Sequence, residues 1–333
     1  MRTTTAMAAT NGVELCYETF GDPAHPALLL VMGTGVQMTE WEPEFVAMFV
    51  EQGFHVVRFD HRDVGLSSRC DDAVRYTLDD LADDAAGLLE ALGIDRAHIL
   101  GASLGGMVAQ CLTIRHPRLV LSLCSIMSTT GAPGVGTSRK DARDALIGPR
   151  PTTRDGVVDA AVTRGRILRG GGFPFDEDMI RRRAGAAFDR AEYPAGRARQ
   201  VAAVLASGDR TDALRSVRVP TVVIHGDADP LVHLSGGEAT AAAIPDARLV
   251  VIPGMGHELP AGAWPLVVEA FAENATRAAP PASCRDRQAS PSCPCADTVP
   301  VRRTATERGR RPLPSTRPTG ASEQSERTME VET

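Results

Sequence analysis

A serine between two glycines is the first feature of the chain that could do chemistry. Gly101-Ala102-Ser103-Leu104-Gly105 matches the G-x-S-x-G pattern of a sharp turn between a strand and a helix, where neighbours with side chains would clash. A serine hydroxyl is a weak nucleophile at its ordinary pKa, so it needs a base and an acid that orients the base. The pattern therefore predicts nucleophilic attack by Ser103, provided that both partners exist elsewhere in the chain.

The base must come from eight histidines. His257 ends the glycine-bearing loop Pro253-Gly254-Met255-Gly256-His257, from which a side chain can reach over the carboxyl edge of a sheet. We therefore favour His257. Histidines near other strand ends stay open as alternatives, namely His61, His225 and His233, whereas a structural or exposed position suits His25, His55, His98 and His116.

The acid is sought after a neighbouring strand. The segment Ser128–Ala132 offers no carboxylate, but Gly226-Asp227-Ala228-Asp229-Pro230 offers two. We favour Asp229, because the proline that follows fixes the turn. Asp227 stays open as the residue that caps this turn.

These side chains must be positioned by alternating strands and helices. The patterns predict strands over residues 13–20, 27–32, 55–60, 97–102, 119–127, 219–225 and 248–252, and helices over 40–51, 76–92, 105–115 and 261–275. This alternation predicts an α/β fold with a mostly parallel sheet covered by helices on both faces. It lapses over residues 128–217, which predicts a mostly helical cap inserted between two sheet strands of a core formed by 1–127 and 218–276.

Ser103, Asp229 and His257 follow one another in this order, each directly after a predicted strand. On these motifs the chain resembles the α/β-hydrolase family, and within it the serine esterases and lipases of the aclacinomycin methylesterase type. The resemblance covers roughly residues 13–275, and it is carried by Leu28–Gly35, Phe59–Ser67, Gly101–Met107, His225–Pro230 and Ile252–His257.

The resemblance implies a role for each site residue. Ser103 would be the nucleophile, His257 the general base and then acid, and Asp229 the group that holds the imidazole tautomer. The backbone N–H groups of Thr34 and Leu104 would form the oxyanion hole, although Met32 stands where the family usually has histidine. Asp60, Arg62 and Asp63 resemble a structural, ion-paired turn of the family that braces the sheet edge, and no metal or organic cofactor is implied.

A substrate pocket is expected between the cap and the sheet. Gly33, Met38, Trp41 and Met107 would line it from the sheet side. Phe173 would line it from the cap, together with other apolar cap residues that could equally form the cap's own core, namely Phe175, Met179, Phe188 and Tyr193.

Composition narrows the class of protein. Hydrophobic residues make up 43% of the 333 residues and charged residues 23%, and the formal charge is −6, which disfavours binding to nucleic acid. The strongly apolar run at 27–32 is far too short to span a membrane, so we expect a cytoplasmic protein whose seven cysteines are mostly buried and reduced. Residues 277–333 contain eight prolines and few large apolar side chains, which predicts a disordered tail.

The predicted function is hydrolysis of a hydrophobic or medium-sized carboxylic ester through an acyl-enzyme. A cofactor-free perhydrolase or haloperoxidase would share the same three residues. A hydrolase-like binding module with negligible turnover is an alternative of a different kind. The acyl and alcohol groups and the oligomeric state are left open.

Overall fold

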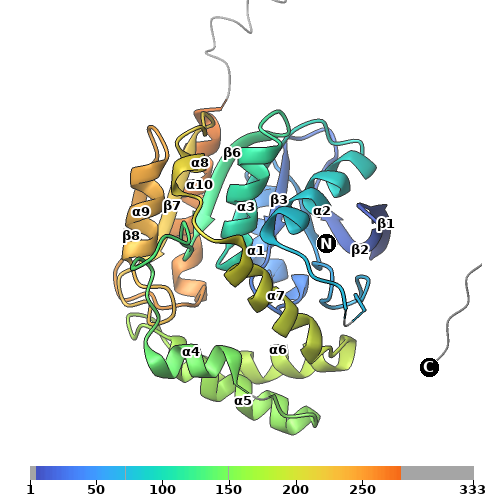
Figure 1. The fold of residues 1–333 in the computed structure, drawn as a ribbon, viewed down its shortest axis with the longest axis vertical. Helices are drawn as coiled ribbons and strands as arrows, with labels where there is room; N and C mark the ends of the chain where they lie inside the picture. Colours follow the sequence, from blue (N-terminus) through green and yellow to red (C-terminus); the bar gives the residue numbers. More distant parts are fainter. Residues whose placement is uncertain (1–4, 72, 149, 279–333) are drawn as a thin grey trace, which may run out of the picture. The chain divides into compact units, whose positions relative to one another are not determined.

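The structure is a computed structural model, and it describes residues 5–71, 73–148 and 150–278 (Figure 1). The tail predicted over 277–333 lies outside these residues, apart from its first two. Cys284, Cys293 and Cys295 lie outside them as well, whereas Cys16, Cys70, Cys111 and Cys124 are free thiols, of which three are buried.

One sheet organises the described residues. Its eight strands have the order β1-β2-β4-β3-β5-β6-β7-β8. The pairs β1·β2 and β2·β4 are antiparallel, and every other neighbouring pair is parallel. The strands are β1 (Ala6–Thr10), β2 (Val13–Phe20), β3 (Ala27–Val31), β4 (His55–Phe59), β5 (Ala97–Ala102), β6 (Val120–Ile126), β7 (Thr221–Gly226) and β8 (Arg248–Ile252).

Helices cover both faces of this sheet. One face carries α2 (Leu78–Ala91), α3 (Leu104–Arg115) and α9 (Ser235–Ala243), and the other carries α1 (Pro43–Glu51) and α10 (Trp264–Thr276). Short 3-10 helices precede α1 and α10, namely η1 (Met38–Glu40) and η2 (Ala261–Ala263). The predicted mostly parallel sheet with helices on both faces is therefore confirmed.

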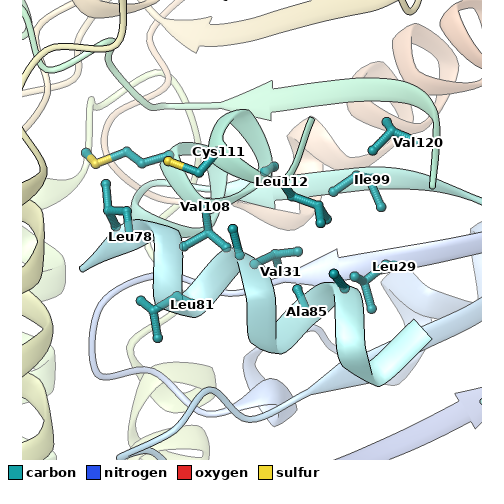
Figure 2. Close-up of a cluster of buried hydrophobic side chains, with 14 of the residues drawn as sticks. Leu29, Val31, Leu78, Leu81, Ala85, Ile99, Val108, Cys111, Leu112 and Val120 are labelled. Carbon is teal, nitrogen blue, oxygen red and sulfur yellow. The ribbon is translucent and has the colours of Figure 1, made fainter. Parts of the chain in front are cut away.

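The central strands are apolar throughout because both of their faces are buried. In β3, Leu29 and Val31 pack toward α2 and α3, whereas Leu28 and Leu30 pack toward α1 and α10. Figure 2 shows the first of these layers, with Leu78, Leu81 and Ala85 of α2 facing the strands. The apolar spacing that predicted a helix near residues 76–92 is thus the face of α2 that packs on the sheet.

Two elements were missed by the sequence analysis. The first, β1, has a small-residue sequence, AMAAT, and lies at the edge of the sheet. Asn11 and Gly12 have positive φ angles of 44° and 77° in the two-residue turn to β2, so this Asn-Gly pair was the available hairpin signal. The second, α9, has the sequence SGGEATAAA, which lacks a strong apolar stripe.

The predicted insertion is helical. In the described part of the segment between β6 and β7 lie five helices, namely α4 (Lys140–Ile147), α5 (Arg154–Leu168), α6 (Glu177–Arg190), α7 (Pro194–Ser207) and the short α8 (Thr211–Leu214). Figure 1 shows α4, α5 and α6 gathered away from the sheet, with α7 leading back to it. The boundaries 128–217 proposed for this cap stay a prediction.

The turn after β4 fastens this insertion to the core. Asp60 forms an ion pair with Arg190 of α6 at 2.7 Å, and Asp63 forms one with Arg199 of α7 at 2.8 Å. Arg62 instead pairs with Asp84 of α2 at 2.5 Å. The turn is ion-paired, as the sequence suggested, but two of its three partners belong to the insertion and not to the sheet edge.

Among the described residues, no helix combines the length and the apolar character that a membrane span needs.

Candidate active site

Ser103 lies on the sharp turn between β5 and α3. Its φ of 57° is in the left-handed region, which a non-glycine residue rarely occupies. A Cβ on Gly101 would lie 2.1 Å from the carbonyl oxygen of Gly105, and a Cβ on Gly105 would lie 2.0 Å from that of Val31. Both glycines are therefore required by close backbone approach, and the turn holds the serine above the sheet.

His257 reaches this serine from the loop after β8. Its Nε2 lies 2.9 Å from the Oγ of Ser103, although the two residues are 154 positions apart. The backbone N–H of His257 donates to the carbonyl of Leu168 at 2.8 Å. The last residue of α5 thus fixes the histidine from the side of the insertion.

Asp229 lies on the other side of the imidazole. Its Oδ2 is 2.8 Å from the Nδ1 of His257, and its Oδ1 accepts the N–H groups of Leu231 and Val232, both at 2.8 Å. Burial by itself would raise the pKa of Asp229, but the charge of His257 and these hydrogen bonds hold the pKa well below its ordinary range. The carboxylate is therefore ionised and oriented wherever the protein is folded near neutral pH.

The structure separates the two aspartates that the sequence left open. Asp227 is exposed, and its Oδ1 accepts the N–H of Gly254 at 2.6 Å. It therefore ties the loop that leads to His257 and does not contact the imidazole of that residue.

A second histidine, His225, lies beside Asp229. Its Nε2 is 3.6 Å from Oδ2 of Asp229 and 2.8 Å from the carbonyl oxygen of Val232. Because a carbonyl only accepts, Nε2 must carry the proton. His225 is fully buried, and its Nε2 is engaged by the carbonyl of Val232, whereas His257 contacts the hydroxyl of Ser103; this argues against His225 as the base.

The loop after β3 faces Ser103. A Cβ on Gly33 would lie 3.4 Å from the Cβ of Ser103. The N–H of Leu104 belongs to the first turn of α3, and the N–H groups of a first turn have no partner within the helix. The N–H of Thr34 takes part in no hydrogen bond within the described residues. The two N–H groups expected to bind an oxyanion are thus free to donate hydrogen bonds to one.

Gln200 of α7 holds this loop in place. Its side-chain Oε1 accepts the N–H of Gly35 at 2.7 Å, and its Nε2 donates to the carbonyl of Arg62 at 3.3 Å. Gln200 is fully buried. Sequence reasoning missed this residue, because it lies in the insertion, where no motif marks it.

Met32 has a backbone role that does not depend on its side chain. Its carbonyl oxygen accepts a hydrogen bond from Nε2 of His61 at 3.0 Å, so the histidine of the turn after β4 holds the backbone that follows β3. Burial lowers the pKa of His61 to about 4, and this ring is therefore neutral at pH 7.

The predicted pocket residues lie in different environments. Gly33 is next to Ser103. Phe173 lies in the connection between α5 and α6, and its ring is close to Gly262, while the neighbouring Gly172 packs against Gly254. Met38 and Trp41 are fully buried, and Trp41 stacks on Phe45 at a ring distance of 5.7 Å. Met107 lies within the core beneath α3. Of the four sheet-side residues, Gly33 lies against the side chain of Ser103, and Met107 meets the serine through its backbone N–H, which donates to the carbonyl of Ser103 at 3.2 Å.

No group of three or more metal-binding side chains occurs in the part of the chain that the structure describes. The site is built instead from hydrogen bonds in series, from Asp229 to His257 to Ser103.

Comparison with known proteins gives concordant results. The α/β-hydrolase fold family matches residues 26–261. The rhodomycin D methylesterase of Streptomyces peucetius is 33% identical over 77% of this chain and 93% of its own length, and that of Streptomyces sp. strain C5 is 32% identical with the same coverage. A solved thermophilic esterase from Thermogutta terrifontis, in a malate-bound form, is 25% identical with a TM-score of 0.65, over 84% of this chain and 99% of its own.

Proposed function

The chain belongs to the α/β-hydrolase fold family, and from this we propose that it is a serine esterase that cleaves a carboxylic ester through Ser103, His257 and Asp229. The observation that carries the proposal is the uninterrupted series of hydrogen bonds, at 2.9 Å and 2.8 Å, that joins the serine hydroxyl to the buried carboxylate. Such a series is what a weak nucleophile needs for activation.

The reaction follows from the positions of these atoms. Ser103 Oγ attacks the ester carbonyl carbon while Nε2 of His257 takes its proton, and Asp229 stabilises the imidazolium that forms. The carbonyl oxygen, now negative, receives hydrogen bonds from the N–H groups of Thr34 and Leu104. The alcohol leaves with the proton from His257, and water activated by the same imidazole then releases the acid and restores the serine.

The cap and the relatives indicate what kind of substrate the enzyme would take. An insertion that fastens to both catalytic loops, through Gln200 and Leu168, favours a medium-sized substrate enclosed between cap and sheet. Since two relatives are methylesterases of rhodomycin D, we include a methyl ester, with methanol as the leaving alcohol, among the substrates to be tested.

The test compares wild type with Ser103→Ala on p-nitrophenyl esters of increasing acyl length, together with fluorophosphonate labelling read by mass spectrometry. We expect turnover in the wild type, its loss in the variant, and one label on the peptide that holds Ser103. Ser216→Ala, at an exposed serine, is the matched control and should behave as wild type. Equal rates for wild type and Ser103→Ala would refute the proposal and favour a binding role.

A further inference from the structure

Three arginines and one glutamate come together from separate segments of the insertion. Arg150 lies between α4 and α5, Arg164 in α5 and Arg197 in α7, while Glu192 lies just before α7. The neighbouring guanidiniums of Arg150 and Arg164 disfavour the charged form of Arg197, and Glu192 favours it. We call these four residues the arginine cluster.

The arginine cluster has more positive than negative charge. Glu192 contacts Arg150 at 3.5 Å. The next acid, Glu40, is already paired with Arg183 at 3.0 Å. Two guanidiniums of the cluster therefore lack a carboxylate of their own.

Arg197 shows this lack most clearly. Arg197 is only 6% exposed. Its one hydrogen bond to the described residues goes to the carbonyl oxygen of Ala145, and the distance of 3.5 Å is at the upper limit for a hydrogen bond. Arg164 is largely shielded and, within the described residues, forms no hydrogen bond or ion pair. Burial and the adjacent guanidiniums lower the pKa of Arg197 to about 9.

The other buried arginines of the described residues have well-formed partners. Arg58 pairs with Glu18 at 2.6 Å and Arg62 with Asp84 at 2.5 Å. Arg210 has no carboxylate but donates to Oε1 of Gln110 and to the carbonyls of Gly208 and Thr129 at 3.3, 3.0 and 2.9 Å. A buried charge without a partner costs several kcal/mol, and an anion supplied from outside removes this cost. The arginine cluster is thus unlike the arginines that hold the fold together.

The arginine cluster adjoins the loop that faces the nucleophile. The stem of Arg197 packs over Gly35, since a Cβ on that glycine would lie 2.7 Å from Cγ of the arginine. Gly33 of the same loop lies against Ser103, and two residues of chain span at most about 7 Å. The side chain of Arg197 therefore starts beside the loop that faces the serine.

We propose that the arginine cluster is an anion subsite that binds a carboxylate of the ester substrate, so that the preferred substrates are half-esters of dicarboxylic acids. A planar guanidinium fork matches a carboxylate in geometry as well as charge. Arg164 and Arg197 supply the contacts, and Glu192 holds Arg150 beside them. This inference rests on the proposed function, because it names the substrate class of the same serine.

The kinetic test uses two chromogenic esters of equal chain length, mono-4-nitrophenyl glutarate and 4-nitrophenyl valerate. We expect the wild type to prefer the anionic ester at least about tenfold in kcat/KM. Arg164→Met and Arg197→Met, made separately, should each reduce the ratio of the two kcat/KM values about 10- to 100-fold, the loss expected for a charge-assisted hydrogen bond. Arg182→Met, at an exposed arginine of α6, should leave the ratio unchanged.

A binding test separates this inference from the proposed function. Monomethyl glutarate is titrated calorimetrically into Ser103→Ala, alone and combined with Arg164→Met or Arg197→Met, after thermal melts have shown that each protein is folded. Binding that weakens about tenfold or more in both arginine variants supports the subsite even if no ester is turned over. Ester turnover without preference for the anionic ester, unchanged in both arginine variants, overturns the subsite and leaves the esterase proposal standing.

Inorganic phosphate identifies the class of anion. Phosphate and glutarate are compared as competitors of bound monomethyl glutarate. If the subsite binds a carboxylate, phosphate should compete more weakly than glutarate. Stronger competition by phosphate would overturn the carboxylate assignment.

Discussion

Replacing Asp229 by asparagine should stop catalysis because the site dictates how the new amide must lie. Two backbone N–H groups, those of Leu231 and Val232, point at Oδ1 of the aspartate at 2.8 Å. The amide of Asp229→Asn must turn its oxygen toward these donors, so its NH₂ group faces Nδ1 of His257. Nδ1 must then accept a hydrogen bond, and the ring proton moves to Nε2, the atom that has to accept the proton of Ser103.

The size of the effect follows from this change of tautomer. A neutral histidine with its proton on Nε2 cannot act as the base, and the corresponding change in a well-studied serine protease lowers kcat about 10⁴-fold. We expect a loss of about 10³- to 10⁴-fold in kcat, with little change in KM, because Asp229 is buried behind the imidazole and does not reach the substrate. The free energy of the transition state would rise by about 4 to 5 kcal/mol.

The assay is p-nitrophenyl ester release by Asp229→Asn and by Asp227→Asn, each at pH 7. Asp227→Asn retains an oxygen that can accept the N–H of Gly254, so its kcat should stay within about tenfold of wild type. Circular dichroism and thermal melts check that both variants fold. If Asp229→Asn kept more than a tenth of the activity, or if Asp227→Asn lost as much, the assignment of the orienting carboxylate would be wrong.

Three further predictions concern stability and the contact between cap and core. Burial lowers the pKa of His98 from 6.5 to about 4, so the unfolded state binds more protons than the folded state between these pH values. The free energy of unfolding should therefore fall by about 3 kcal/mol as the pH drops from 6.5 to 4. His98→Gln should remove this pH dependence, as measured by urea unfolding, and an unchanged pH dependence would contradict the prediction. Asp63→Asn removes the buried carboxylate charge that pairs with Arg199 of α7 and should lower the free energy of unfolding by about 3 to 5 kcal/mol. Asp212→Asn, at an exposed pair, should change it by less than about 1 kcal/mol. Gly170→Ala should lower kcat, because the added Cβ would lie 2.3 Å from the carbonyl oxygen of Gly254 and push the loop that carries His257. Gly171→Ala controls for lost stability alone, since its φ of 95° strains the backbone while its Cβ meets open space, so it should lower the melting temperature and leave kcat nearer to wild type. Equal kcat values for the two variants would argue against coupling through the contact with Gly254.

The strands and the serine turn could be predicted from the sequence because local physics determines them. A parallel strand buried on both faces must be apolar along its length, and the run Ala27–Val31 is. The two glycines around Ser103 are needed because a Cβ at either position would lie 2.0 to 2.1 Å from a backbone carbonyl oxygen, and this need is visible as G-x-S-x-G. The order of serine, aspartate and histidine followed from the strands, since Ser103 directly follows β5 and the other two residues lie in the loops after β7 and β8.

Contacts made by the insertion could not be predicted in the same way. Gln200 meets Gly35 across 165 positions, and the sequence around it contains no pattern that specifies this partner. Met38 and Trp41 show the opposite problem, because large apolar residues near a catalytic loop suit a pocket and a core equally well. Only the packing of Trp41 on Phe45, inside the core between the sheet and α1, distinguishes the two.

The insertion takes part in the geometry of the reaction as well as in enclosing the substrate. The carbonyl of Leu168 holds the backbone of His257, and Gln200 holds the loop that carries Thr34, so one segment fixes both the base and one oxyanion donor. The pair of Asp63 with Arg199 anchors α7 at the residue next to Gln200. A displacement of α7 large enough to open the site would therefore break the support of the oxyanion loop. Exchange of the insertion between relatives should consequently change kcat together with substrate preference, even where Ser103, His257 and Asp229 are all retained.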